Sequence, residues 1–352
     1  MKSYPRREFL AQSLAIGLPL TLAGRSLAQW SEPDPELAAM QMVTPEAERA
    51  INQALTYLQR RQREDGSIGS VGYDRNVAVA ALVGMAYISN GSVPNQGPFG
   101  QQVTRCVDYV LMCAQPSGMI LSPSDVSHGP MYGHGFATMF LAEVYGMTPD
   151  SAVREKLSRA VQLIVNTQNE EGGWRYKPER ADADVSVTVC QVMALRAARN
   201  TGIYVPSETI DRCVEYIKQC QNSDGGFMYQ AENGGVSAFP RSAAAVAALY
   251  SAGLHNDAEI KKGLSYLMEH LPQTTAMSRE GRFFYGQYYG AQAMWHAGGD
   301  HWQQWYPAVR DVLIAQQRKN GSFSGDICPE YCTAMASIVL QMPNNYLPIF
   351  QR

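Results

Sequence analysis

The stretch RAVQLIVNTQNEEGGW, residues 159–174, is followed by a near copy, RCVEYIKQCQNSDGGF, at residues 212–227. In both copies apolar residues recur at i, i+3, i+4 and i+7, a spacing typical of an amphipathic helix. Each copy then continues with a glutamine-asparagine pair, two glycines and an aromatic residue. Because glycine readily takes the left-handed conformation that ends helices, each copy predicts a helix followed by a tight turn.

The same pattern recurs along the chain at a near-constant spacing. Aligned on the apolar residue near the end of each helical pattern, the copies lie 52, 54, 53, 50 and 46 residues apart. A period of this size indicates an architecture built of repeats. The six aligned positions are Leu58, Val110, Ile164, Ile217, Leu267 and Leu313.

A second helical segment follows each glycine break and is apolar on nearly every side. Such a helix must be buried all round, so these segments predict an inner layer. Six amphipathic outer helices alternating with six apolar inner ones predict an all-α fold, an α/α toroid of six helical hairpins. We expect a closed ring, because six pairs can complete a circle and neither terminal copy shows a polar capping face. The inner segments are VAVAALVGMAYI (77–88), GFATMFLAEVYG (135–146), VSVTVCQVMALRAA (185–198), SAAAVAALYSAG (242–253), YGAQAMWHAGG (289–299) and CTAMASIVLQM (332–342).

The pattern R-A-x-x-L-I-x-x-x-Q-x-x-x-G-x-W of residues 159–174 resembles the QW repeat of the squalene cyclase and protein prenyltransferase superfamily. The resemblance covers about residues 45–352 and implies an α/α toroid, in agreement with the periodicity. It is closest to the squalene-cyclase-like repeat proteins of bacteria. The motif then acts as a clasp, in which Gly172 ends the helix, Gln168 satisfies open backbone groups and Trp174 packs across the junction. Chemistry is expected where the inner helices face a shared central cavity.

The composition predicts a globular protein that does not bind nucleic acid. Of the 352 residues, 45% are hydrophobic and 17% are charged, which is ample for a large core and too little charge for disorder. The formal net charge is −3, and no run of basic residues offers a phosphate-binding surface. Seven cysteines are present. Cys106 and Cys113, like Cys213 and Cys220, are seven residues apart in predicted helices, about 10 Å along the axis, and we expect no disulfides.

The N-terminal segment resembles an export signal of the twin-arginine type. Arg6 and Arg7 precede an apolar run that ends near Ala23, and a small-residue site closes at Ala28. We therefore expect residues 1–28 to be removed, residues 29–45 to form a lead-in segment, and residues 46–352 to form the toroid. The expected location is periplasmic or otherwise extracytoplasmic. No later stretch has the roughly 20 apolar residues of a membrane span, so the mature chain is expected to hold none.

The resemblance directs attention to the segment DADVSVT, which begins at Asp182. In squalene-hopene cyclases a DxDD motif at the head of an inner helix supplies the acid that protonates the substrate. Asp182 and Asp184 match that motif, whereas Val185 replaces its last aspartate. A helix N-terminus favours the ionised carboxylate and is expected to lower the pKa of Asp184. Asp184 is thus either a candidate acid or a plain N-cap, and the sequence leaves both open.

A second family pattern, the D-x-C of zinc-dependent protein prenyltransferases, is matched by Asp326 and Cys328. Cys332 is a further thiol nearby. In a closed ring the neighbouring inner helix is that of the first repeat, which has no histidine to complete three protein ligands. We expect no metal and no cofactor.

Other candidates lie at or near the heads of inner helices. His134, among glycines, is a candidate acid or base, or a group that orients Asp184, and equally a core histidine bonded to backbone. Aromatic rings of the fifth repeat can line a cavity and stabilise a cation, and an arginine can meet an anionic head group. The candidate ligand-binding residues are Tyr132, Arg241, Tyr285, Tyr288, Tyr289, Trp295 and Tyr331.

Three functions are compatible with these features. The first is an enzyme or carrier acting on an apolar, isoprenoid-like molecule in the central cavity, with Asp184 as candidate acid. The second is a non-catalytic toroid of the cell envelope that binds protein, lipid or glycan. The third is a glycan-degrading toroid, which needs two facing carboxylates; Asp74, Asp182 and Asp184 leave it open without supporting it.

Overall fold

The computed structural model describes residues 39–123, 129–273 and 281–351. The predicted signal, residues 1–28, and most of the lead-in lie outside this part of the chain. The chain divides into two units after Pro35, and everything below concerns the unit Glu36–Arg352.

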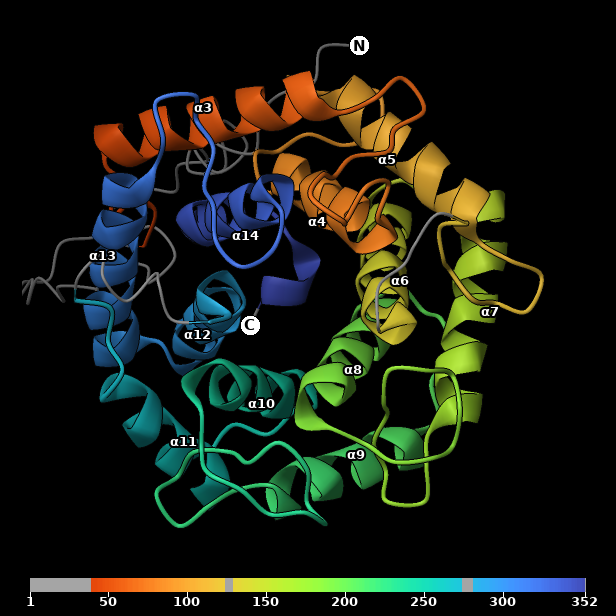
Figure 1. The fold of residues 1–352 in the computed structure, drawn as a ribbon, viewed down its shortest axis with the longest axis vertical. Helices are drawn as coiled ribbons and strands as arrows, with labels where there is room; N and C mark the ends of the chain where they lie inside the picture. The colour runs from red at the N-terminus through yellow and green to blue at the C-terminus, as the bar shows by residue number, and fades with distance from the viewer. Residues whose placement is uncertain (1–38, 124–128, 274–280, 352) are drawn as a thin grey trace, which may run out of the picture. The chain divides into compact units, whose positions relative to one another are not determined.

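Twelve α-helices make up the described part of this unit, and Figure 1 shows them as two concentric rings. The outer and inner helices alternate along the chain, which confirms the predicted α/α toroid of six hairpins. The outer helices are α3 (Pro45–Arg61), α5 (Gly100–Cys113), α7 (Ser151–Thr167), α9 (Ser207–Gln219), α11 (Ala258–Met268) and α13 (Gly299–Gln316). The inner helices are α4 (Val77–Ile88), α6 (Pro130–Met147), α8 (Val185–Asn200), α10 (Phe239–Ser251), α12 (Phe283–Ala297) and α14 (Pro329–Gln341).

The two kinds of helix differ in burial as their sequences predict. In α4 every residue except Ala78 is buried, because neighbours cover all sides of an inner helix. The outer helix α9 buries one stripe, which includes Ile210, Cys213 and Ile217, and turns its charged residues to solvent. The fifth inner helix begins at Phe283, six residues before the segment expected from the sequence, because the aromatic run before Tyr289 is helical as well.

The ring is closed by contacts between the last hairpin and the first, as predicted. Helix α14 packs against both α3 and α4. The amide of Gln341 in α14 donates to the Ala86 carbonyl of α4 at 3.1 Å. The carboxylate of Glu330, whose side chain is 1% exposed, pairs with Arg61 at 2.8 Å and accepts from the Ser70 hydroxyl at 2.7 Å. These bonds join segments at opposite ends of the described chain.

The turn after Gln168 has the contacts expected of a clasp. The Gln168 amide donates to the carbonyl of Gly172 and to the carbonyl of Thr209 in the next outer helix, both at 2.8 Å. Gly172 has φ +97°, and a Cβ there would lie 2.3 Å from the Arg212 carbonyl oxygen, so only glycine fits. Trp174 is buried and its indole N–H donates to the Ile164 carbonyl at 2.8 Å.

The same clasp recurs in other repeats and takes part in closure. Gln62, Gln221 and Gln317 each donate to the carbonyl of a glycine four residues later and to a carbonyl of the next outer helix. For Gln317 that helix is α3, where Ala50 accepts at 2.8 Å. In these four repeats the glutamine therefore fastens one outer helix to the next, and Gln317 fastens the sixth repeat to the first.

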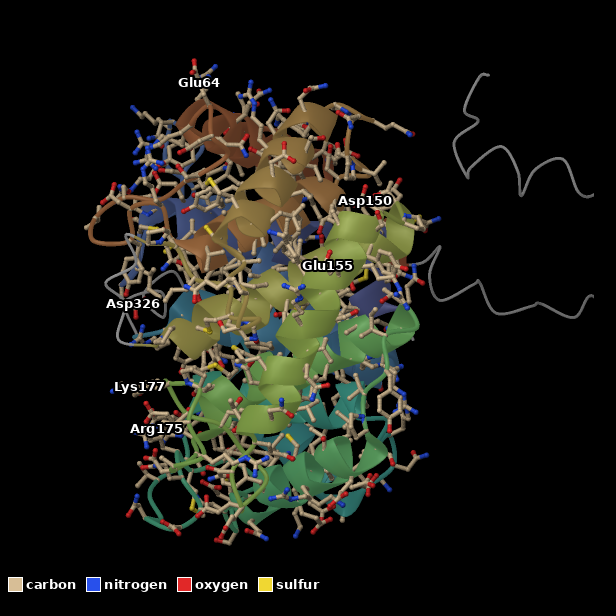
Figure 2. The ribbon with its side chains drawn as sticks, turned by 90° about the vertical axis from the view of Figure 1, so that its right-hand side faces the viewer. Glu64, Asp150, Glu155, Arg175, Lys177 and Asp326 are labelled. Carbon is tan, nitrogen blue, oxygen red and sulfur yellow. The ribbon has the colours of Figure 1, made fainter. Side chains whose placement is uncertain are left out.

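Alternation of direction gives the ring two ends. We call the end where the inner helices begin the N-terminal face and the end where they finish the C-terminal face. Arg175, before α8, and Asp326, before α14, lie at the same edge of the molecule in Figure 2, whereas Asp150, the N-cap of α7, lies at the opposite edge. The turns that lead into inner helices thus share the N-terminal face.

The segment after α14 turns into the centre of the ring, where Figure 1 marks the end of the chain. It contains two 3₁₀ turns, η2 (Met342–Asn344) and η3 (Pro348–Phe350), and η3 packs against α8 and α12. We call residues 345–351 the strap. The strap is therefore packed against inner helices through a 3₁₀ turn rather than along a fully extended path.

Two other expectations concern cysteines and membrane spans. All seven cysteines lie in the described residues, and all are buried and free, as predicted. Within the described part of the chain, no helix combines the length and apolar character needed to cross a bilayer.

Candidate functional site

Asp184 is held at the start of α8 by the turns of two successive repeats. Its side chain is fully buried, and its Oδ1 accepts from the Val187 N–H at 2.9 Å as an N-cap. Its own N–H donates to the Trp174 carbonyl at 3.0 Å. The next N–H, of Val185, donates to the Tyr229 carbonyl at 3.0 Å. The clasp of the third repeat and the turn of the fourth therefore set the position of this carboxyl.

The electrostatics of Asp184 differ from the expectation drawn from the sequence. Burial raises the pKa of Asp184 to about 6, although the Val187 N–H and the Arg175 charge both act to lower it. The helix N-terminus was expected to depress this pKa, and that prediction is wrong because loss of hydration outweighs the cap. Asp184 is therefore an N-cap, and burial holds its pKa above the ordinary value.

The second oxygen of Asp184 faces a cluster of polar and aromatic groups. Oδ2 lies 3.3 Å from Arg175 Nε in an ion pair but has no hydrogen-bond partner among the described residues. Arg175 also pairs with Asp182, which is half exposed, and its guanidinium lies over the rings of Tyr176 and Tyr229 at 4.9 and 5.6 Å. We call this group the Asp184 cluster, made of Tyr132, Arg175, Tyr176, Asp182, Asp184 and Tyr229.

The tyrosines of the cluster come from three repeats. The hydroxyls of Tyr176 and Tyr229 share one hydrogen bond. The centroid of the Tyr132 ring lies 6.1 Å from that of the Tyr176 ring. Burial, followed by the nearby Asp184 charge, raises the pKa of Tyr132. Tyr132 was expected here from the sequence, whereas Arg175, Tyr176 and Tyr229 were not. A signal was present, because a tyrosine stands two residues after the clasp aromatic in both the third and fourth repeats.

The central cavity expected from the sequence is filled by side chains on the C-terminal side of the Asp184 cluster. Phe136 of α6 and Tyr288 of α12, on opposite sides of the inner ring, have centroids only 6.4 Å apart. The Cys190 thiol of α8 and the Tyr289 hydroxyl of α12 lie 3.6 Å apart. Large rings reach across the axis and meet there, which helix periodicity alone does not reveal.

Several predicted ligand-binding residues belong to this crossing layer. Tyr285 donates to the Ser186 carbonyl at 3.3 Å, and its ring contacts that of Tyr289 edge to face at 4.9 Å. Burial raises the pKa of Tyr285 and of Tyr331, and in both cases the Cys190 thiol adds to the effect. The predicted residues that the structure brings together near Cys190 are Tyr132, Asp184, Tyr285, Tyr288, Tyr289 and Tyr331.

His134 does not lie in the Asp184 cluster. Its Nδ1 accepts from the Ile120 N–H at 3.1 Å, and its Nε2 faces the Ala160 carbonyl at 3.3 Å. Burial lowers the pKa of His134 to about 4, so the ring is neutral. With both nitrogens used on backbone groups, His134 does not orient Asp184 and is a core histidine that ties α6 to its neighbours.

The side chains of Arg241 and Trp295 bond backbone carbonyl groups and form no bond with Asp184 in the described chain. The Arg241 guanidinium donates to the carbonyls of Phe227 at 2.9 Å and of Val236, and so holds the turn before α10. The Trp295 indole donates to the Phe350 carbonyl at 2.8 Å, near the C-terminal face. Trp295 thus supports the fold near the C-terminal face, whereas Arg241 lies at the N-terminal face and holds the turn that follows Tyr229.

The acidic and thiol residues of the second family pattern have other partners. The Asp326 carboxylate accepts from the Arg282 N–H at 3.0 Å, and Cys328 and Cys332 are buried. Asp74 pairs with Arg63 at 3.2 Å. In the described part of the chain, no three His, Cys, Asp or Glu side chains are grouped as metal ligands.

Comparison with protein families gives one match. A model described as the prenyltransferase alpha-alpha toroid domain matches residues 36–155 and 101–286, which together span residues 36–286. No curated protein shows significant sequence similarity to the chain.

Solved structures with the same fold include a terpene cyclase and α-mannanases. The type II terpene cyclase MstE from Scytonema, in its apo form, is 15% identical with a TM-score of 0.57, covering 86% of this chain and 100% of that one. The GH76 α-mannanase BT2949 of Bacteroides thetaiotaomicron is 10% identical with a TM-score of 0.61, covering 89% and 98%. An inactive α-1,6-mannanase GH76A of Salegentibacter sp., in complex with α-1,6-mannotriose, is 6% identical with a TM-score of 0.64, covering 85% and 99%. At these identities the likeness establishes the fold alone.

Proposed function

Since the chain belongs to the family of prenyltransferase alpha-alpha toroid domains, we propose that it binds an apolar, isoprenoid-like molecule at the N-terminal face and exchanges a proton with it through Asp184. The observation that carries this proposal is the fully buried Asp184 carboxyl, whose pKa burial raises to about 6 despite its 3.3 Å ion pair with Arg175. Burying a carboxyl costs free energy, and a buried carboxyl with a raised pKa beside a charged partner is a candidate for a functional site. A terpene cyclase of the same fold has been solved with geranylgeranyl dihydroxybenzoate as substrate, which supports the ligand class.

The pKa of Asp184 narrows the chemistry. With a pKa of about 6, roughly one molecule in ten carries the proton at pH 7. An acid of this strength is far too weak to protonate an unactivated alkene, but it suits proton transfer to an oxygen near neutral pH. In that step the carboxyl gives its proton to an oxygen of the ligand, and the carboxylate left behind is stabilised by the Val187 N–H and the Arg175 charge. The rings of Tyr132, Tyr176 and Tyr229 supply apolar faces and hydroxyls around it.

The test compares Asp184→Asn with Asp182→Asn. The purified chain and both variants are examined by native mass spectrometry and by lipid extraction from the expression host. We expect the wild type to release a modified lipid, and Asp184→Asn to retain the unmodified lipid with turnover at least about 100-fold lower. Asp182 is half exposed and bonds Arg175 and the Gln230 amide rather than Asp184, so its variant should change turnover much less.

The pH dependence is a second readout of the same test. Because the protonated carboxyl is the active form, turnover should fall about ten-fold for each pH unit above pH 6. Identical lipid profiles in wild type and Asp184→Asn at every pH would contradict the catalytic role.

The runner-up function is a non-catalytic binding protein of the cell envelope, and one observation favours it. The rings of Phe136, Tyr288 and Tyr289 meet across the axis, so the centre of the inner ring is filled at their level. A filled centre suits binding at a face better than enclosure of a reacting molecule. Recovery of an unaltered ligand from both the wild type and Asp184→Asn would favour this function.

Export remains our proposal on the sequence of residues 1–28. The twin arginines Arg6 and Arg7, the apolar run and the small-residue site support a twin-arginine signal. The conservative change of both arginines to lysine should leave the chain uncleaved in the cytoplasm, which cell fractionation measures. Normal appearance of the processed variant in the periplasm would contradict the signal.

A further inference from the structure

A pocket of about 230 Å³ lies at the N-terminal face, where the mutually packed helices α10, α11 and α12 meet. Its walls come from the head of α10, the end of α11 and the first turns of α12. Phe283 and Gln287 are one turn apart on α12, so the same side of that helix brings both to the pocket. No residue of the Asp184 cluster is among the described residues that line it, so this pocket is separate from that cluster.

Aromatic rings form one wall of this pocket. The ring centroids of Tyr266 and His270 lie 4.5 Å apart, and the Phe239 ring stacks on that of His270 at 5.7 Å. The His270 ring is fixed, because its Nδ1–H donates to the Tyr266 carbonyl at 2.9 Å. Gly286 of α12 lets Phe239 approach, since a Cβ there would lie 2.8 Å from the Phe239 ring. The wall is therefore a flat, largely apolar surface held in place by the fold.

The Gln287 amide is the unpaired polar group of this pocket. Gln287 is 2% exposed, and its Oε1 accepts no hydrogen bond from the part of the chain that the structure describes. Other glutamines of the inner helices differ, because the amides of Gln191 and Gln341 donate to the backbone carbonyls of neighbouring helices. A buried amide without a protein partner costs free energy, so its presence in the wall of a pocket points to a ligand that pairs with it.

We propose that this pocket binds a small, uncharged, flat heterocycle whose edge carries a hydrogen-bond donor beside an acceptor. A primary amide presents an acceptor oxygen and a donor nitrogen in one plane, so such an edge pairs with Gln287 through two bonds. The flat body of the ligand lies against the rings of Phe239, Tyr266 and His270.

The lining of the pocket sets the charge and the size of this ligand. The described residues that line it include no Asp, Glu, Lys or Arg, so a charged ligand would lose its hydration without gaining a partner. The volume is below the roughly 300 to 1,000 Å³ typical of sites for drug-sized molecules, so a molecule of one or two rings suits it. This site does not depend on the function proposed for Asp184.

Two matched pairs of planar compounds test the proposal. Uracil and phthalimide each carry an N–H donor beside a carbonyl acceptor, whereas N,N′-dimethyluracil and N-methylphthalimide keep the rings and carbonyls and lose the donor. Binding of each compound to the intact chain and to two variants is measured by ligand-observed NMR titration. Gln287→Leu removes the amide at nearly constant volume. Gln292→Leu is the control, because Gln292 is a buried glutamine of the same helix whose Oε1 is also unpaired in the described chain, yet it does not line the pocket.

Uracil and phthalimide should bind the intact chain at least about five-fold more tightly than their N-methyl derivatives, the discrimination expected of one bidentate pair. Gln287→Leu should abolish this difference, and Gln292→Leu should keep it. Gln287→Leu should also melt no lower than wild type, because it removes no bond within the protein.

The proposal is overturned if neither compound binds better than its N-methyl derivative, in which case the Gln287 amide is paired with water only. It is equally overturned if Gln287→Leu preserves the difference. A lower melting temperature of Gln287→Leu would contradict it as well, since the amide would then have a partner in the fold.

Discussion

At the scale of single residues, burial decides the charge of two carboxyls of the inner ring. Asp184 and Glu143 are both enclosed, and burial raises the pKa of each, to about 6 and about 8. The backbone N–H that each accepts acts in the opposite direction and is outweighed. A residue's position at a helix end therefore does not determine its protonation when hydration is lost.

Glu143→Gln should raise stability in a pH-dependent manner. The pKa of Glu143 is higher in the folded chain than its ordinary value of 4.5, so folding retains a proton that the unfolded chain releases above pH 4.5. This cost is absent below pH 4.5, grows as the pH rises, and is complete above about pH 8. We expect the variant to be about 1 to 3 kcal/mol more stable at pH 8 and not more stable at pH 4, measured by urea denaturation.

Glu155→Gln is the matched control for this prediction. Glu155 is an exposed carboxylate on α7 that pairs with Arg159 at 2.7 Å, and Figure 2 shows it on the outside of the ring. Its replacement should change stability by less than about 0.5 kcal/mol at either pH. Equal stability of Glu143→Gln and wild type at pH 4 and pH 8 would show that Glu143 is not held neutral.

At the scale of elements, the clasp explains how one glutamine position joins successive repeats. Gln62, Gln168 and Gln317 stand directly after α3, α7 and α13, and each bonds the next outer helix around the ring. The second repeat has Ala114 at this position, after α5. Its glycine, Gly118, has φ +91° and approaches the Arg159 carbonyl of α7 as closely as Gly172 approaches that of Arg212.

This comparison predicts opposite effects for two substitutions. Gln168→Ala removes two buried hydrogen bonds and leaves the carbonyls of Gly172 and Thr209 without this donor, and should destabilise the fold by about 1 to 3 kcal/mol. Ala114→Gln supplies the missing amide to Gly118 and should stabilise the fold by up to about 1 kcal/mol. Thermal and urea unfolding measure both. A destabilising Ala114→Gln would mean that the second repeat is not equivalent to the others.

The helices were predictable from the sequence because the distribution of apolar residues around each helix shows which of its sides are buried. All-round apolar segments such as residues 77–88 can only be inner helices, and the structure places α4 at those residues. The start of α12 was missed by six residues because Phe283 and Phe284 fit either a cavity wall or a helix equally well. The periodicity of apolar residues predicts which side of a helix is buried, but it does not predict which residues cover that side.

The candidate site was less predictable for the same reason. Asp184 was identifiable from a motif along the chain, but Arg175, Tyr176 and Tyr229 join it only through the packing of neighbouring turns. The filled centre depends on how far the side chains of Phe136 and Tyr288 reach across the axis. Such contacts join opposite helices, and no local pattern records them.

At the scale of the whole molecule, a small number of buried polar side chains join the last hairpin to the first and so close the ring. Glu330 accepts from Arg61, Ser70 and Tyr57, all in the first repeat, and the bonds from Ser70 and Arg61 lower its pKa despite burial. A carboxyl with a depressed pKa stabilises the fold above its ordinary pKa of 4.5 and loses this effect as the pH falls.

Glu330→Gln should therefore destabilise the chain by about 1 to 3 kcal/mol at pH 7 and by much less at pH 3, measured by urea denaturation. Glu46→Gln is the control, because Glu46 forms a similar 2.7 Å pair with Arg49 on the exposed surface of α3. A loss of stability that is the same at both pH values would show that the charge of Glu330 is not what joins the last hairpin to the first.

The bond from Gln317 to Ala50 links positions 267 residues apart, so it cannot form until nearly all of the chain has left the ribosome. During synthesis the flanks of α3 and α4 that α14 later covers remain bare and apolar. Exposed apolar surface of an incompletely folded chain is prone to aggregation and is bound by chaperones. These flanks become buried when the last hairpin docks. A chain that stops short of α14 therefore lacks the helix that covers these flanks, so the apolar surface of the first hairpin is buried only when the circle is complete.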